Sequence, residues 1–152
     1  MTLGTTRGTA AGTTLGADHV RVQVPATSAN LGPGFDALGI ALAHHDHLEV
    51  RTLEGPEVRV EVTGEGAGEV PEDESHLVVV AVRRGLDHAG APRTGLHLTC
   101  TNRIPHGRGM GSSAAAVVSG LLAARGLLAD PSLLDDSTVL ALATELEGHP
   151  RR

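Results

Sequence analysis

Apolar and polar residues alternate in four segments of the chain, which is the pattern of β-strands that bury one face. The segments are 19–24, 47–53, 57–63 and 95–101. Pro25 is predicted to end the first strand because proline cannot donate a ladder hydrogen bond. A Glu-Gly-Pro tripeptide separates the second segment from the third, so we expect a hairpin or a short meander there. The apolar run 37–43 fits either a strand or a buried turn.

Two segments in the middle of the chain carry helix signals. The first helix is expected over 76–88, with Ser75 as its N-cap and Gly90 just beyond its end. The second is expected over 112–128. It has no charged residue before Arg125, so we predict a helix that is buried on most sides.

A last helix is predicted over 135–147. Its cap candidates are Asp135, Asp136 and Ser137. Leu140, Ala143 and Leu146 are expected to share its buried face. The order of elements is mostly β at first and then mixed, which favours an α+β sandwich over a doubly wound parallel sheet.

Composition and charge narrow the classes of function. The chain has 152 residues, enough for one domain with a core, and Phe35 is its only aromatic residue. The core must therefore be aliphatic, and this composition argues against an aromatic stacking platform for single-stranded nucleic acid. A formal net charge of −6 disfavours phosphate backbones and anionic lipids. We expect neither a nucleic acid nor a membrane as partner.

The N-terminal residues, the lack of a long apolar run and the single cysteine bear on the domain organisation and location of the protein. Residues 1–18 are rich in Thr, Gly and Ala and lack an apolar run, so we predict a disordered tail rather than a secretory signal. One domain is expected over 19–152. No segment reaches the roughly 18 apolar residues of a membrane span, which favours a cytoplasmic protein. Cys100 lies in an alternating strand and is predicted to be a small core residue.

The segment 105–115 carries the most chemistry: Pro-His-Gly-Arg-Gly-Met-Gly-Ser-Ser-Ala-Ala. Its glycines let the backbone approach a ligand, and the helix that follows directs free N–H groups at the loop, which makes an anion site. The hydroxyls of Ser112 and Ser113 could bind phosphate oxygens or Mg²⁺. The pattern is neither a P-loop nor a dinucleotide fingerprint. The alternative is a glycine-rich turn in which serine only caps the helix.

A second loop follows the first predicted strand. It carries Asn30 and Asp36 six residues apart among turn-forming residues. An amide and a carboxylate on a rigid loop could bind an ammonium group and a hydroxyl. The alternative is a turn in which both side chains only cap the backbone.

The segment 105–115 resembles the ATP loop of the GHMP kinases, Pro-x-x-x-Gly-Leu-Gly-Ser-Ser-Ala-Ala, with Met110 in place of leucine. The resemblance implies the N-terminal GHMP kinase domain, a two-layer α/β sandwich also known from a ribosomal protein, and it implies ATP and Mg²⁺. It makes Ser112 and Ser113 the catalytic candidates. The residues implied at the ATP phosphates are Pro105, His106, Gly107, Arg108, Gly109, Met110, Gly111, Ser112, Ser113 and Ala114.

The segment 24–39 resembles the form that the first GHMP motif takes in homoserine kinases, Ser-Ala-Asn-Leu-Gly-Pro-Gly-Phe-Asp-x-Leu-Gly. This implies phosphorylation of L-homoserine by ATP to O-phospho-L-homoserine in threonine biosynthesis. It also implies that Asn30 and Asp36 bind the substrate, with Asp36 neutralising the ammonium group.

The last residues resemble the family's Glu-Gly-His-Pro-Asp-Asn stretch as far as Pro150, after which two arginines replace Asp-Asn. The resemblance implies that His149 lies near homoserine. It also implies that a carboxylate shares Mg²⁺ with Ser113, and Glu145 is a candidate, although a solvent-facing Glu145 is the simpler interpretation. Because the match ends inside a motif, we expect a truncated chain without its C-terminal domain and with impaired activity. The complete enzyme could be a homodimer.

Three alternatives stay open at this stage. The chain could serve another GHMP kinase reaction, of the mevalonate or galactose type, or it could be a non-catalytic nucleotide-binding remnant. The tetrapeptide His-His-Asp-His at 44–47 could be a metal cluster, but no second cluster accompanies it, which favours a polar strand edge.

Overall fold

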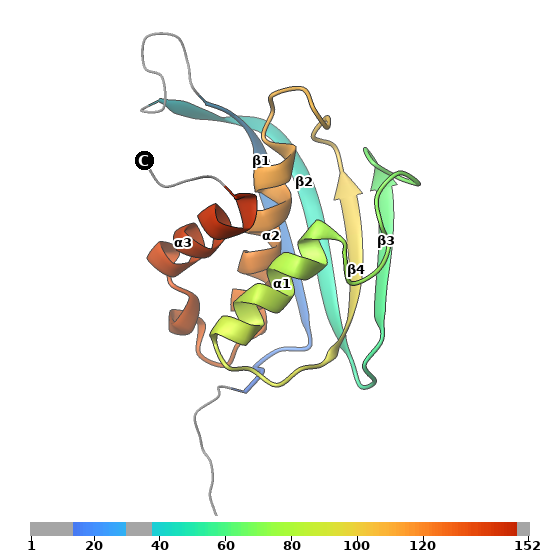
Figure 1. Cartoon of the computed structure of the whole chain (residues 1–152), viewed down its shortest axis with the longest axis vertical. Helices are drawn as coiled ribbons and strands as arrows, with labels where there is room; N and C mark the ends of the chain where they lie inside the picture. Colours follow the sequence, from blue (N-terminus) through green and yellow to red (C-terminus); the bar gives the residue numbers. More distant parts are fainter. Residues whose placement is uncertain (1–13, 30–37, 149–152) are drawn as a thin grey trace, which may run out of the picture.

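A four-stranded sheet covered on one face by helices forms the protein (Figure 1). The computed structural model describes residues 14–29 and 38–148. The predicted α+β, two-layer architecture is confirmed. The elements are β1 (His19–Ala29), β2 (Gly39–Leu53), β3 (Val58–Gly64), α1 (Leu77–His88), β4 (Gly95–Asn102), α2 (Ser112–Leu127), the 3₁₀ helix η3 (Pro131–Leu134) and α3 (Asp136–Glu147).

The strand order β1-β2-β4-β3 differs from the expected hairpin or short meander. β4 lies between β2 and β3; it is antiparallel to β2 and parallel to β3. The parallel pair is joined by α1, because parallel neighbours need a long crossover. Gly95 begins β4 so close to the β2–β3 turn that an added Cβ would lie 2.2 Å from the carbonyl oxygen of Gly55. The prediction of a β2–β3 hairpin or short meander is wrong, since alternation identifies strands and not their partners.

β1 does not end at Pro25, as we predicted, but continues to Ala29. It pairs with β2 on one side, and its register shifts between Pro25 and Thr27, which marks a bulge. Proline is tolerated there because β1 is an edge strand at a bulge, where the missing N–H breaks no regular ladder. The open question about 37–43 is answered for its described part, because β2 begins at Gly39.

Aliphatic side chains fill the space between the sheet and the helices. The sheet contributes Val50, Leu96 and Leu98, all fully buried, and α2 contributes Val117 and Leu121. Half of the residues of α2 are buried, which confirms the prediction made from its lack of charge. Each large side chain removed from water stabilises the fold by about 1.5–3 kcal/mol.

The helices correct two predictions and agree with a third. His76 caps α1, while Ser75 donates its N–H and hydroxyl to Asp73. Asp135 caps α3 as expected. Leu140, predicted to be buried, is 69% exposed, and Val139 and Leu142 are buried instead. Leucine occurs on both faces of α3, so the pattern alone did not determine which face is buried. The packing of α3 against α2 and η3 determines it.

Residues 14–18 belong to the folded part of the chain, contrary to the predicted disorder up to residue 18. Leu15 bridges Leu128, Gly16 N–H donates to the Leu127 carbonyl at 2.8 Å, and Ala129 N–H donates to the Thr14 carbonyl at 3.0 Å. This short antiparallel contact satisfies backbone groups at the end of α2. Residues 1–13 lie outside the described part. Within the described ranges, no helix has the length and apolar character needed to cross a bilayer.

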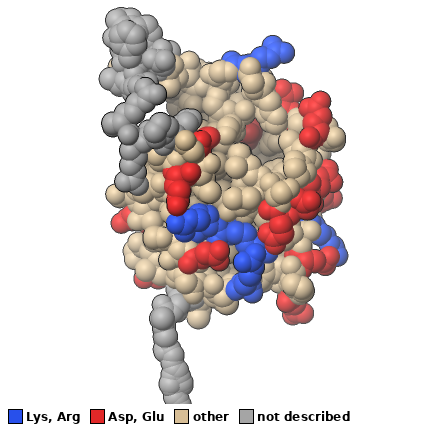
Figure 2. All heavy atoms as spheres, viewed as in Figure 1, with Lys and Arg blue, Asp and Glu red and all other residues tan. Residues whose placement is uncertain are grey.

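Charged side chains of both signs mix on the helical face (Figure 2). They include the ion pairs Arg83–Glu74, Arg84–Glu145 and Arg125–Asp136, at 3.0, 3.2 and 2.8 Å. Exposed pairs of this kind contribute at most about 1 kcal/mol each. Arg83 differs from the other arginines of these pairs because its side chain is buried, with 9% exposure. It also donates a hydrogen bond to the Thr94 carbonyl, which links α1 to the start of β4.

We predict that Gly120→Ala destabilises the protein by about 1–3 kcal/mol. A Cβ at Gly120 would lie 2.6 Å from the Cβ of Ala81 and 2.8 Å from the Val78 carbonyl oxygen, so α1 and α2 would have to separate. Urea unfolding followed by circular dichroism measures the effect.

Gly126→Ala is the matched control on the same helix. Its nearest neighbour would be a methyl group of half-buried Val20 at 3.0 Å, which can move. Helix propensity favours alanine by about 1 kcal/mol at both positions. A Gly120→Ala protein as stable as the wild type would contradict the close packing of α1 on α2.

Candidate functional site

The glycine-rich loop between β4 and α2 takes three left-handed turns in five residues. Gly107, Gly109 and Gly111 have φ of 69°, 72° and 73°, which L side chains rarely adopt. Ile104, fully buried before these turns, and Met110, at their end, pack in a small second core with Val24, Ala26 and Ala115. The loop is therefore anchored at both ends, while its glycines expose the backbone.

β1 holds the far end of this loop. The N–H of Thr27 donates to the Met110 carbonyl at 2.9 Å. An added Cβ at Gly111 would lie 2.3 Å from the Oγ1 of Thr27, so both its φ and this contact require glycine. The strand edge that β2 leaves open is thus used to position the loop, two residues before β1 ends at Ala29.

The N-terminus of α2 is open to an anion. No side chain caps it among the described residues, and its first turn contains no acidic residue. α1 and α3 differ, since His76 and Asp135 cap them. The backbone N–H groups at the start of α2 and the positive end of its dipole thus remain available beside the glycine loop.

Two hydroxyls and one carboxylate lie at this helix end. Ser112 and Ser113 begin α2, and the hydroxyl of Ser113 donates to Oε2 of Glu147 at 2.9 Å. Glu147 is the last residue of α3 and is only partly exposed. Oxygen ligands of this kind suit Mg²⁺.

Glu145, the predicted metal candidate, does not approach Ser113 in this arrangement. It is exposed and pairs with Arg84 of α1 at 3.2 Å. Residues two apart on a helix point about 200° away from each other, so Glu145 and Glu147 cannot serve the same site. The sequence held no signal that would select Glu147, because the choice depends on how α3 packs.

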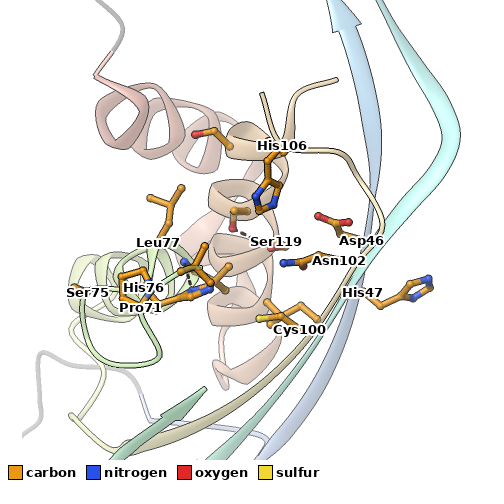
Figure 3. Close-up of a pocket in the computed structure, with 16 residues that line it drawn as sticks. Asp46, His47, Pro71, Ser75, His76, Leu77, Cys100, Asn102, His106 and Ser119 are labelled. Atoms are coloured by element: carbon orange, nitrogen blue, oxygen red, sulfur yellow. Dashed lines mark hydrogen bonds between the residues drawn. The ribbon is translucent and has the colours of Figure 1, made fainter. Parts of the chain in front are cut away.

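A cavity of about 370 Å³ opens beside the loop (Figure 3). Its walls come from the middle of β2, the end of β4, the segment before α1 and the first turns of α2. Asn102, His106 and His76 reach it from three separate parts of the chain, and Val70 and Pro71 add an apolar side. Of the residues that line the cavity, the sequence patterns had pointed only to His106, Ser112 and Ser113 as candidates for binding ATP.

Cys100 lies at the base of the cavity and is 2% exposed. Burial raises the pKa of its thiol to about 12, and the carboxylate of Asp46 acts in the same direction. The thiol therefore stays protonated and unreactive. The prediction of a small core cysteine is confirmed.

His76 connects the cavity wall to the stability of α1. Its Nδ1 accepts the N–H of Val78 at 3.1 Å, which requires a neutral ring. Burial lowers the pKa of His76, and the nearby carboxylates of Asp73 and Glu72 offset this only in part.

The structure brings together only part of the predicted site. The loop residues and both serines lie along one side of the cavity mouth or next to it. Asn30, Asp36 and His149 lie outside the described residues. Within the described ranges, no three His, Cys, Asp or Glu side chains gather as a metal cluster, so 44–47 does not form one there.

We predict a pH-dependent contribution of His76 to stability. A lowered pKa in the folded state means that the contribution is present above the ordinary pKa of about 6.5 and is lost as the pH falls below it. His76→Asn keeps a cap acceptor that does not titrate, so it should lose less stability than the wild type between pH 7.5 and 5.5.

His76→Ala removes the cap and should cost about 1 kcal/mol at pH 7.5. Urea midpoints at both pH values measure the two effects. Equal pH dependence in the wild type and His76→Asn would contradict the assignment.

Comparisons with known proteins agree with this geometry. Residues 76–151 match the family model described as the GHMP kinases N terminal domain. A homoserine kinase of Clavibacter michiganensis subsp. michiganensis is 57% identical over 132 residues, which are 87% of this chain and 42% of the relative. The structure of homoserine kinase from Cytophaga hutchinsonii has a TM-score of 0.72 at 33% identity, over 87% of this chain and 42% of that chain.

Mevalonate kinase from Methanococcus jannaschii shares the fold, with a TM-score of 0.63 at 18% identity, over 87% of this chain and 47% of that chain. At this identity the likeness concerns the fold alone. The chain spans less than half the length of each of these relatives.

Proposed function

The chain belongs to the GHMP kinase family, and on that premise we propose that it serves the phosphorylation of L-homoserine by ATP, which gives O-phospho-L-homoserine. The substrate is inferred from the relatives, since the homoserine kinase of Clavibacter michiganensis is 57% identical to this chain. The site supports the phosphoryl-transfer part of the proposal independently.

One observation carries the proposal: the uncapped N-terminus of α2 directly follows three left-handed glycines. The free N–H groups at the start of α2 and the positive end of its dipole lie beside the exposed backbone of the glycine loop. This arrangement favours the binding of a phosphate group. The other two described α-helices use a side chain to cap the same groups. In our proposal, residues 105–114 hold the phosphates of ATP at this end of α2.

The cavity beside the loop suits the remainder of the nucleotide. Ser112 and Ser113 line it on the side of the loop. The rest of its wall combines an apolar side with polar groups such as Asn102 and His106. Small-molecule sites typically have this combination of an apolar lining and a few polar groups.

Ser113 and Glu147 fit a magnesium site. Their side-chain oxygens are 2.9 Å apart at the end of α2 where the phosphates would lie. When bound, Mg²⁺ would neutralise charge on the phosphate oxygens. We propose Ser113 and Glu147 as its protein ligands, with Ser112 beside them on the phosphates, and we assign Glu145 to the ion pair with Arg84.

The proposed homoserine contacts are Asn30, Asp36 and His149. The segment that carries the first two follows Ala29 directly, and β1 is bonded to the glycine loop at Thr27. The phosphate loop and the start of the substrate segment therefore share one anchor. Holding two reactants in a fixed geometry supplies much of the catalysis in phosphoryl transfer. The proposal also includes a role in threonine biosynthesis and a cytoplasmic location.

Substrate preference tests the proposed function. Calorimetric titration with Mg·ATP, followed by ADP release with L-homoserine or mevalonate, should show ATP binding and a preference for homoserine. A preference for mevalonate would favour another GHMP reaction. Binding without turnover of either substrate would favour the non-catalytic alternative, and the absence of ATP binding would contradict the site.

Ser113→Ala and Glu147→Gln should each weaken Mg·ATP binding about tenfold, because each removes an oxygen ligand of a divalent cation. Glu145→Gln is the matched control, two residues earlier on α3, and should stay within about twofold of the wild type. Titrations at several Mg²⁺ concentrations measure the effect. A larger loss in Glu145→Gln than in Glu147→Gln would overturn the assignment of the carboxylate.

A further inference from the structure

The tetrapeptide at 44–47 contacts the entrance of the glycine loop. Oδ1 of Asp46 accepts the N–H of Arg103 at 2.6 Å and the N–H of Ile104 at 2.8 Å. Nε2 of His44 bonds the Arg103 carbonyl at 2.6 Å. Two side chains at alternate positions of β2 thus hold three backbone groups of two consecutive residues, while His47 points away from the cavity (Figure 3).

These contacts lie where the regular sheet ends. The pairing of β2 with β4 stops at His47 and Thr101. Beyond that point the chain leaves the ladder, and its N–H groups need other acceptors. Ile104 is fully buried, so an unsatisfied N–H there would cost about 1–3 kcal/mol. The carboxylate of Asp46 replaces the ladder with two charge-assisted hydrogen bonds.

The glycine loop depends on such anchors, because its own residues make few contacts. An added Cβ at Gly107 or Gly109 would meet nothing within 4 Å. Glycine has more conformational freedom to lose than other residues, so a loop of this kind is ordered mainly through its ends. At the end of the loop, the N–H of Thr27 donates to the Met110 carbonyl. At its start, the carboxylate of Asp46 accepts the backbone N–H of Arg103.

We propose that Asp46, assisted by His44, is a positioning residue that fixes the entrance of the glycine loop and thereby sets its affinity for a nucleoside triphosphate. This rests on the proposed function for the identity of the ligand. Asp46 acts through the backbone of Arg103 and Ile104. Its acceptor oxygen is therefore essential, while its charge only strengthens these two hydrogen bonds and does not act on the ligand.

Two substitutions at one position separate these roles. Asp46→Asn keeps an acceptor oxygen and removes the charge, whereas Asp46→Ala removes both. Asp135→Ala is the matched control, because Asp135 also accepts a backbone N–H, that of Thr138 at 2.8 Å, but belongs to the cap of α3.

Amide hydrogen exchange by NMR and calorimetric titration with Mg·ATP are the two readouts. In Asp46→Ala the amides of Arg103 and Ile104 and those of 107–111 should exchange about tenfold faster, and ATP should bind about tenfold more weakly. Asp46→Asn should restore both to within about threefold of the wild type. Asp135→Ala should leave the exchange of the loop and the ATP affinity within about twofold.

Three results would overturn the proposal. One is unchanged exchange of 107–111 in Asp46→Ala; another is faster exchange with an unchanged ATP affinity. The third is equal weakening in Asp46→Asn and Asp46→Ala, which would mean that the charge acts on the ligand directly. If the wild type binds no ATP, the proposed function fails, and the exchange data alone still decide whether Asp46 orders the loop.

Discussion

The N-terminus of α2 sets the constraint on which the rest of the structure depends. Half of the residues of α2 are buried, yet among the described residues no side chain caps its start. Open N–H groups at the end of a largely buried helix are stable only where solvent or a ligand reaches them. The three left-handed glycines before α2 keep this end accessible, since they turn the chain without placing side chains over it.

The packing around α2 follows from this constraint. Gly120 lets α1 approach closely, and the aliphatic side chains beside it fill the core against β2 and β4. With α2 held firmly in the core, its open end has a defined place relative to the sheet. Glu147, at the end of α3, reaches Ser113 only because α3 packs on α2. Stability and the geometry of the site are thus supplied by the same contacts.

The loop between β4 and α2 is held by polar contacts from two neighbouring strands. Thr27 of β1 bonds its exit, and Asp46 of β2 bonds its entrance. Both contacts lie where a regular ladder is interrupted, at the bulge in β1 and beyond the last β2–β4 pair. Interruptions of a sheet commonly occur beside sites, because the freed backbone groups and side chains can be directed at a neighbouring segment.

Much of this protein was determined by the sequence alone. Alternation located all four strands, the lack of charge marked α2 as buried, and the glycine-serine segment predicted the anion site that we propose. The proposed contacts at Asn30, Asp36 and His149 stay predictions, since those residues lie outside the described part. The tertiary structure alone decided that β4 separates β2 from β3, that β1 passes through Pro25, that Glu147 rather than Glu145 meets Ser113, and that Asp46 holds Ile104. The reason is physical: periodicity records which face of an element is buried, whereas these contacts join residues as far as 58 positions apart, and only the packing of whole elements brings such residues together.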